Sequence, residues 1–172
     1  MTLLGAVLAG GQSRRFGSDK AMAMLDGRAL IDRVIAAIAP QVDAVIVCGR
    51  AGALADRPGG NLGPLAGINA ALHHARATGF DAVVSVPCDS PFLPGDLVAR
   101  IGVGPVSVVD SPVIGCWPTR LADDLDAWLA TGPDRSMRGW IRACGARVVD
   151  VGEIVNVNTP AELRLASARL LR

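Results

Sequence analysis

The sequence predicts an α/β fold in which helices cover both faces of a mostly parallel central sheet, a three-layer α/β/α sandwich. Short apolar runs alternate along the chain with longer segments whose apolar residues recur at helical spacing. Hydrophobic residues make up 51% of the 172-residue chain, but aromatic residues only 3%. The core must therefore be aliphatic, which suits a sheet buried between two helical layers. We expect one domain, spanning residues 1–172.

The first half of the chain sets up the predicted sheet. Three short apolar runs, each followed by glycine or proline, are predicted to be buried strands: Leu3–Leu8, Ala44–Cys48 and Ala82–Val86. Two segments with helical spacing end just before a helix breaker and are predicted to be helices: Ala29–Ala39 and Leu65–Ala77. Because ligands in such folds bind outside the carboxyl ends of the strands, the loops after these three strands are the predicted functional loops.

The second half is predicted to continue the alternation with shorter elements. Helices are predicted at Pro94–Ile101, Leu121–Leu129 and Met137–Cys144. Strands are predicted at Val106–Val109, Val113–Trp117 and Arg147–Val151. A last helix is expected at Pro160–Leu171, because Thr159 can cap its first turn and proline is favoured at the first helical position.

Charge and cysteine content exclude several classes of protein. The net charge of +1 gives no electrostatic argument for a nucleic-acid or membrane partner. No apolar run reaches the roughly 18 residues that span a bilayer, and the first residues lack the basic region of a signal peptide. The four cysteines are far apart and form no C-x-x-C pair: Cys48, Cys88, Cys116 and Cys144. We therefore expect buried, reduced thiols in a cytoplasmic protein rather than a disulfide or metal site.

The loop after the first strand combines glycines with basic residues. Gly10 and Gly11 allow a ligand to approach the backbone, and the basic residues Arg14, Arg15 and Lys20 follow in the same loop. The spacing matches neither a P-loop nor G-x-G-x-x-G. A triphosphate carries roughly four negative charges, which a divalent cation and two basic side chains would neutralise. The alternative is an ordinary surface loop with solvated arginines.

Lys20 is the only lysine, since 16 of the 17 basic residues are arginines. A compact ammonium and a planar guanidinium are not interchangeable at a phosphate, so this lysine is a candidate phosphate ligand.

Two further loops carry candidate residues. The segment 61–68 is a glycine-containing turn that leads into a helix N-terminus, a position that favours anions or polar edges, although a plain loop-to-helix junction is the alternative. Asp89 follows the third strand and faces the same crevice, where a carboxylate suits Mg²⁺. An Asx-turn before Pro91 is its structural alternative. Asn156 and Asn158 could hold a metal-site oxygen or a polar substrate group, or stabilise a turn.

These motifs resemble those of a known family. The pattern Leu8-Ala9-Gly10-Gly11-x-Ser13-x-Arg15-x-Gly17-x-Asp19-Lys20 is similar to the signature loop of the molybdenum cofactor guanylyltransferases, which belong to the glycosyltransferase-A-like nucleotidyltransferases. Gly63–Gly67, Pro87–Pro91 and Val155–Leu163 resemble the nucleotide-side, metal-binding and closing motifs of that family, in the same order. The resemblance implies a Rossmann-like nucleotidyltransferase fold and spans nearly the whole chain.

The resemblance also implies a reaction and roles for individual residues. GTP and molybdopterin would give the guanine dinucleotide cofactor and pyrophosphate, with Mg²⁺ as the cofactor. Catalytic roles fall on Arg15, Lys20 and Asp89, and the metal ligand is Asp89. The nucleotide-binding residues implied are Leu8, Ala9, Gly10, Gly11, Lys20, Asp56, Gly63, Pro64, Leu65, Gly67 and Asp89. The pterin side would use Arg135, Asn156 and Asn158. Candidate protein partners are molybdenum-insertion proteins and molybdoenzyme apoproteins.

The chain departs from the family pattern in places, and two other functions remain open. Cys48 stands where the family often has asparagine, Ser111 precedes Pro112 where histidine is common, and the segment 101–112 is short. One alternative is a sister enzyme such as a molybdenum cofactor cytidylyltransferase, and the other is a nucleotide-binding or cofactor-carrier module without turnover. His73 and His74 lie on a predicted helix and are expected to be surface or packing residues.

Overall fold

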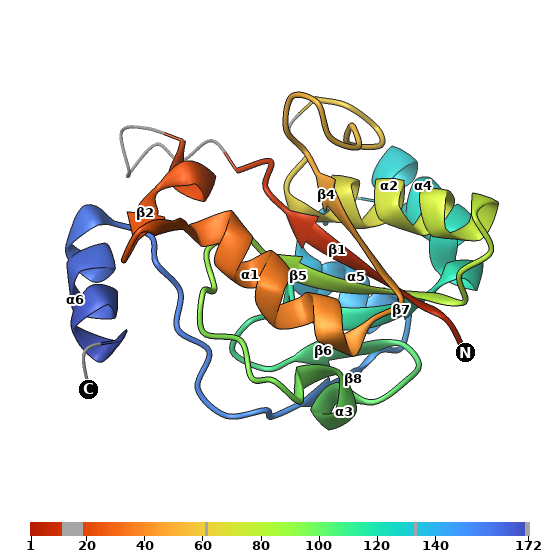
Figure 1. Ribbon diagram of the computed structural model, residues 1–172. Helices are drawn as coiled ribbons and strands as arrows, with labels where there is room; N and C mark the ends of the chain where they lie inside the picture. Colours follow the sequence, from red (N-terminus) through yellow and green to blue (C-terminus); the bar gives the residue numbers. More distant parts are fainter. Residues whose placement is uncertain (12–18, 61, 133, 171–172) are drawn as a thin grey trace.

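The computed structural model describes residues 1–11, 19–60, 62–132 and 134–170, and its central element is a six-stranded sheet (Figure 1). The sheet contains β1 (Leu3–Leu8), β4 (Ala44–Cys48), β5 (Ala82–Pro87), β6 (Val106–Val108), β7 (Gly115–Pro118) and β8 (Arg147–Val149). The α-helices are α1 (Leu30–Ile38), α2 (Pro64–Ala77), α3 (Leu97–Ile101), α4 (Ala122–Thr131), α5 (Met137–Ala143) and α6 (Pro160–Leu170). Short 3₁₀ turns are η1 (Lys20–Met22), η2 (Ala39–Gln41) and η3 (Thr119–Leu121).

The strand order is β4-β1-β5-β7-β6-β8, and β1 lies parallel to both of its neighbours. Only β7 runs against the others, pairing antiparallel with β5 and β6, while β6 and β8 are parallel. The predicted mostly parallel sheet is therefore confirmed. Leu8 is in register with Cys48 on one side and Pro87 on the other, so the three predicted functional loops leave the same edge of the sheet.

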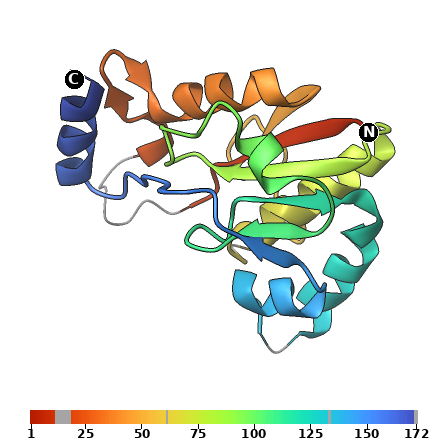
Figure 2. The ribbon, with the colours of Figure 1, turned by 90° about the horizontal axis from the view of Figure 1, so that it is seen from below.

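Helices cover both faces of the sheet, as predicted. One face packs on α1 and α3, and the other on α2, α4 and α5 (Figures 1 and 2). The alternation of side chains along β5 explains this: Val84 and Val86 belong to the first cluster, whereas Val83 belongs to the second. Trp117 is fully buried in the second cluster, and its Nε1 donates to Ser85 Oγ at 2.8 Å.

The sequence pattern missed a small hairpin beside the main sheet. The strands β2 (Met24–Leu25) and β3 (Arg28–Ala29) pair antiparallel, and α6 packs beside them, away from the layers of the sheet (Figure 2). Leu25, Val157 and Ala166 form a separate buried cluster there. Two-residue strands are too short to show a period of two, so residue alternation could not reveal them.

Several predicted boundaries shift by a few residues. The segment 94–96 precedes α3 rather than forming its first turn, and the strand expected from Val113 begins at Gly115 as β7. The predicted cap of the last helix is confirmed, because Glu162 N donates to Thr159 Oγ1 at 3.2 Å. All four cysteines are free thiols, but Cys144 is only half-buried. Within the described ranges, no helix is long and apolar enough to cross a bilayer.

Candidate active site

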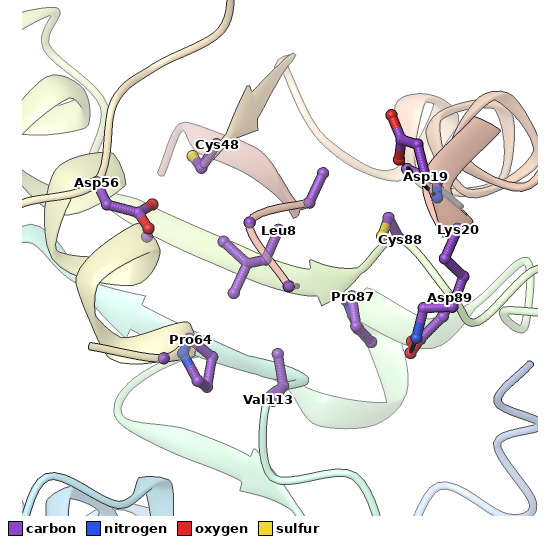
Figure 3. A pocket seen from close by; sticks show the side chains of 16 residues that line it. Leu8, Asp19, Lys20, Cys48, Asp56, Pro64, Pro87, Cys88, Asp89 and Val113 are labelled. Atoms are coloured by element: carbon purple, nitrogen blue, oxygen red, sulfur yellow. Dashed lines mark hydrogen bonds and ion pairs between the residues drawn. The ribbon is translucent and has the colours of Figure 1, made fainter. Parts of the chain in front are cut away.

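A pocket of about 610 Å³ opens at the carboxyl ends of β1, β4 and β5 (Figure 3). Its walls are the loops that follow those strands, together with η1 and the N-terminus of α2. The lining residues are Leu8, Ala9, Gly10, Gly11, Asp19, Lys20, Ala21, Cys48, Asp56, Gly63, Pro64, Gly67, Pro87, Cys88, Asp89 and Val113. Figure 3 shows Asp56 and Cys48 to one side of Leu8, and Lys20 with Asp89 to the other. The pocket therefore has two chemically different ends.

At one end, Lys20 brings two acceptor oxygens together. Its Nζ donates to Asp89 Oδ2 at 2.6 Å and to Asn158 Oδ1 at 3.0 Å. The Lys20 and Asp89 side chains are only 16% and 17% exposed, so this ion pair is partly desolvated. Val157 N donates to Asp89 O at 2.8 Å, which joins the segment before α6 to the loop after β5. Residues far apart in the sequence thus converge on one ammonium group.

The oxygen atoms at this end can be compared with the ligands that a divalent cation prefers. The Asp89 carboxylate and the Asn158 amide oxygen already surround one positive charge, the Lys20 ammonium. Magnesium prefers such hard oxygen ligands, usually one or two carboxylates completed by water and phosphate. The donor set therefore fits Mg²⁺.

At the other end, Asp56 lies among glycines. A Cβ added to Gly49, whose φ is +82°, would lie 2.7 Å from Gly10 Cα and 3.0 Å from Asp56 Oδ1. A Cβ added to Gly67 would lie 3.1 Å from Leu8 Cδ2 and, in ordinary contact, 3.4 Å from Asp56 Oδ1. Glycine at these positions allows the loops after β1 and β4 and the start of α2 to approach one another around the carboxylate.

The Asp56 carboxylate is electrostatically unusual. Desolvation by burial raises its pKa above the ordinary value for aspartate. Within residues 1–11, 19–60, 62–132 and 134–170, its side chain makes no hydrogen bond or ion pair. A pocket-lining acceptor of this kind is suited to a ligand that brings its own N–H donors.

The two pocket cysteines are poor nucleophiles. Burial, followed by the nearby Asp56 charge, raises the pKa of Cys48 to about 12. Burial, followed by the Asp89 charge, raises the pKa of Cys88 to about 11. Both thiols are therefore protonated at neutral pH, and thiolate chemistry is not what this pocket offers.

Ten sequence-predicted site residues line the pocket. They are Leu8, Ala9, Gly10, Gly11, Lys20, Asp56, Gly63, Pro64, Gly67 and Asp89. Leu65 is fully buried in the core beneath α2 and does not line it. Asn158 reaches the site through Lys20, whereas Asn156 Oδ1 accepts from Ser90 Oγ at 2.6 Å. Arg135 is exposed just before α5 and is not a lining residue, and Arg14 and Arg15 lie outside the described residues.

Some site contacts were not predicted from the sequence. Asp19 caps η1 by accepting from Ala21 N at 3.2 Å, and its other oxygen pairs with Arg50 at 2.9 Å. This ion pair joins the loops after β1 and β4 at the pocket rim. Asp19 and Arg50 stand 31 residues apart, so only the in-register pairing of β1 with β4 could have indicated their contact.

A second group of potential metal ligands lies outside the pocket. Among the described residues, His73, Asp123 and Asp126 have ligand atoms within 4.8 Å of one another, on α2 and α4. Each carboxylate is already held by an arginine: Arg76 bonds to Asp123, and Arg57 bonds to Asp126. The cluster is thus neutralised by guanidinium groups, and the partly buried His73 places its Nε2 2.9 Å from Asp126 Oδ2.

Comparison with known proteins gives consistent matches. The family described as MobA-like NTP transferase domain matches residues 5–148. A molybdenum cofactor guanylyltransferase of Sinorhizobium fredii is 38% identical, over 96% of this chain and 91% of the relative. One from Cereibacter sphaeroides is also 38% identical, over 99% of this chain and 98% of the relative.

Solved structures show the same fold. Molybdopterin-guanine dinucleotide biosynthesis protein A from Archaeoglobus fulgidus superimposes with a TM-score of 0.76 at 24% identity, covering 98% of both chains. The 2-C-methyl-D-erythritol 4-phosphate cytidylyltransferase from Thermus thermophilus gives a TM-score of 0.65 at 18% identity, covering 100% of this chain and 99% of the other. At these identities both likenesses concern the fold alone.

Proposed function

Because this chain belongs to the MobA-like NTP transferase family, and within it to the molybdenum cofactor guanylyltransferases, we propose that it transfers GMP from GTP to the terminal phosphate of molybdopterin. The products are the guanine dinucleotide cofactor and pyrophosphate. The observation that carries the proposal is the meeting of the glycine-rich loop, the only lysine and the Asp89 carboxylate in one pocket. The two molybdenum cofactor guanylyltransferases compared above match nearly the full length of the chain.

The reaction needs charge neutralisation more than a strong base. An oxygen of the pterin phosphate attacks the α-phosphorus of GTP, and the bond from that phosphorus to the bridging oxygen of the β-phosphate breaks. A phosphate monoester has a second pKa of about 6, so the nucleophile is already largely anionic at neutral pH. The high pKa values of the pocket thiols agree with a mechanism that uses no cysteine nucleophile. Catalysis is then positioning and electrostatic stabilisation.

We propose that the end of the pocket formed by Lys20 and Asp89, called the phosphate end below, binds the triphosphate. In this proposal the Asp89 carboxylate and the Asn158 amide oxygen would hold Mg²⁺, and Lys20, which now bonds to both, would bind the phosphates. Magnesium, when bound, neutralises charge on the phosphate oxygens. Arg15, which lies outside the described residues, is proposed to add a second positive charge. Lys20 and Asp89 now neutralise each other, so on binding the carboxylate would gain a cation and the ammonium would gain phosphate oxygens in exchange for their mutual contact.

We propose that the opposite end, which contains Asp56 and is called the nucleoside end below, binds the nucleoside. The backbone of residues 8–11 and the turn from Gly63 to Gly67 form its walls, and the Asp56 carboxylate is the acceptor available to it. Leu65 would act from the core, by supporting the first turn of α2. For the pterin we propose Asn156, Asn158 and the exposed Arg135.

A sister enzyme such as a molybdenum cofactor cytidylyltransferase is the second candidate, because the same phosphate chemistry can serve a nucleotide with another base. A binding or carrier module without turnover is the third.

We further propose that the chain acts as one nucleotidyltransferase domain in the cytoplasm, with molybdenum-insertion proteins or molybdoenzyme apoproteins as partners.

The experiment is pyrophosphate release from each of the four ribonucleoside triphosphates with purified molybdopterin and Mg²⁺. Guanine and cytosine present different hydrogen-bonding edges, and a buried polar group left unpaired penalises the wrong base. We expect GTP to be preferred over CTP by about tenfold or more in kcat/KM, which corresponds to about 1.4 kcal/mol. Equal or reversed preference would favour the cytidylyltransferase, and binding without pyrophosphate release would favour the carrier module.

A further inference from the structure

Asp126 on α4 is the centre of a cluster outside the pocket. Its carboxylate accepts from Arg57 Nη2 at 2.8 Å and from Arg57 Nε at 3.1 Å. It also accepts from Asn69 Nδ2 at 2.5 Å, and His73 Nε2 lies 2.9 Å from Oδ2. Asn69 is fully buried on α2, so its bond attaches the Asp126 carboxylate to that helix as well as to the Arg57 guanidinium.

Arg57 directly follows Asp56, the acceptor at the nucleoside end of the pocket. On the other side of Asp56, Leu54 N donates to Val47 O at 3.0 Å and so ties the chain to β4. Arg57 N donates to Ala66 O at 3.0 Å, and Arg57 O accepts from Asn69 Nδ2 at 3.0 Å. The position of Asp56 is therefore set by the anchors on either side of it.

We propose that Asp126 is a positioning residue for the nucleotide: by holding Arg57 against α2 and α4, it fixes Asp56 at the nucleoside end of the pocket. The inference rests on the proposed function for the identity of the ligand. The link itself belongs to the ligand-free protein. Asp126 does not line the pocket, so it acts on binding indirectly, through the Arg57 side chain and through Asn69, which bonds both to Asp126 and to Arg57 O.

The geometry of the contact supports a positioning role over a merely stabilising one. Two nitrogens of one guanidinium meet the carboxylate, an arrangement that constrains orientation as well as distance. The two backbone bonds of Arg57 remain when the side-chain contact is lost, so the segment loosens without unfolding. A displacement of the order of an ångström at a binding group is enough to weaken its interaction strongly.

The fold supplies a matched control. Arg76 on α2 bonds to Asp123 on α4 through two nitrogens, at 2.8 and 2.9 Å. This pair joins α2 to α4 and carries the same charges as the Arg57–Asp126 pair, but it does not involve the segment that bears Asp56. Asp123→Asn therefore reproduces the loss of charge and of a helix–helix contact, while leaving the Arg57 contact in place.

The test compares Asp126→Asn with Asp123→Asn by calorimetric titration with Mg-GTP and by hydrogen exchange of the ligand-free protein. We expect Asp126→Asn to weaken Mg-GTP binding about tenfold. We expect kcat at saturating GTP to stay within about twofold of wild type, because the phosphate end is unchanged. Amides 54–57 should exchange faster in Asp126→Asn only. Asp126→Glu should restore part of the affinity, and Arg57→Gln should show the same loss without adding to it.

The outcomes separate this inference from the proposed function. Wild-type affinity for Mg-GTP in Asp126→Asn, or an equal loss in Asp123→Asn, would overturn the positioning role. Unchanged exchange at amides 54–57 would overturn it even if the wild type bound no guanine nucleotide. Faster exchange in Asp126→Asn together with a wild type that binds no GTP would overturn the proposed function and uphold the link between Asp126 and the segment.

Discussion

The two ends of the pocket are built in opposite ways. At the phosphate end, charged groups neutralise one another, because Lys20 bonds to both Asp89 and Asn158. At the nucleoside end, Asp56 has no such partner within the described part of the chain, and glycines surround it. The contrast indicates that a ligand must replace existing contacts at one end, whereas at the other it meets an acceptor held ready by the scaffold.

This difference has a consequence for how substitutions act. Side chains at the phosphate end contact the reacting groups in the proposed mechanism, so changes there should affect turnover. Backbone conformation and remote anchors determine the nucleoside end, so changes there should affect affinity.

The largest expected effect is at the phosphate end. Asp89→Asn keeps the shape of the side chain but removes the charge that would hold Mg²⁺, so turnover should fall by about 10²- to 10³-fold. We expect a loss of only about 1–3 kcal/mol in the free energy of unfolding, because Lys20 keeps its bond to Asn158. Pyrophosphate release and thermal unfolding measure the two quantities.

Asp96→Asn is the control for this substitution, since Asp96 forms an exposed ion pair with Arg100 beside α3. It should leave turnover unchanged. Pyrophosphate release by Asp89→Asn at nearly the wild-type rate would remove Asp89 from the metal site and would end the contrast between the two ends.

An intermediate effect is expected from the backbone at the nucleoside end. Gly49→Ala should raise KM for GTP about tenfold, because its Cβ would force Gly10 and Asp56 apart. Gly52→Ala is the matched control: its φ is also positive, at +76°, but no atom of the described residues lies within 4 Å of the added Cβ. Gly52→Ala should cost about 1 kcal/mol of stability from backbone strain and leave KM unchanged.

Steady-state kinetics with GTP, together with denaturant unfolding, distinguishes the two glycines. If both variants kept the wild-type KM, close approach around Asp56 would not matter for the nucleotide.

The smallest expected effect is the pH dependence of the Asp126 contact. Hydrogen bonding from Arg57, with a smaller contribution from Asn69, lowers the pKa of Asp126 to about 2. Since its pKa in the unfolded chain is about 3.9, its stabilising contribution is complete above that pH and is lost as pH falls toward 2. Between pH 5 and 9, where the carboxylate is ionised, it should therefore make wild type more stable than Asp126→Asn by about 1 kcal/mol.

Urea unfolding of both proteins across this range and down to pH 3 measures the difference, which should shrink only below about pH 4. A difference that stayed the same from pH 5 down to pH 3 would show that ionisation of Asp126 does not support the contact.

The sequence predicted the parts of the site that depend on strand ends. Glycines after Leu8 and a carboxylate after the third strand had to meet at one edge, because parallel strands end together. Lys20 was predicted for a reason of composition, as the only lysine in the chain. Asp89 was predicted to face the same crevice as Lys20. The ion pair between the two side chains was not predicted.

The contacts that the sequence could not predict depend on side-chain packing between distant elements. Arg57 and Asp126 stand 69 residues apart, and nothing in either local pattern distinguishes them from solvated surface charges. The pairing of Asn158 with Lys20 similarly depends on where the segment before α6 crosses the sheet edge. Periodicity predicts which face of an element is buried, but not which polar groups meet at its margins.

The most direct measurement of the central claim, that a triphosphate binds at the Lys20–Asp89 end of the pocket, is chemical labelling of Lys20. An amine-specific acylating reagent can react only with Lys20 and the N-terminal amine, which peptide mapping separates. Met1 is 68% exposed and far less enclosed than the Lys20 side chain, so its amine serves as the internal reference. Saturating Mg-GTP, at roughly a hundred times Kd, should slow labelling of Lys20 by about tenfold or more and leave Met1 unaffected. Labelling of Lys20 at the same rate with and without Mg-GTP would contradict the account and assign the phosphates to another part of the molecule.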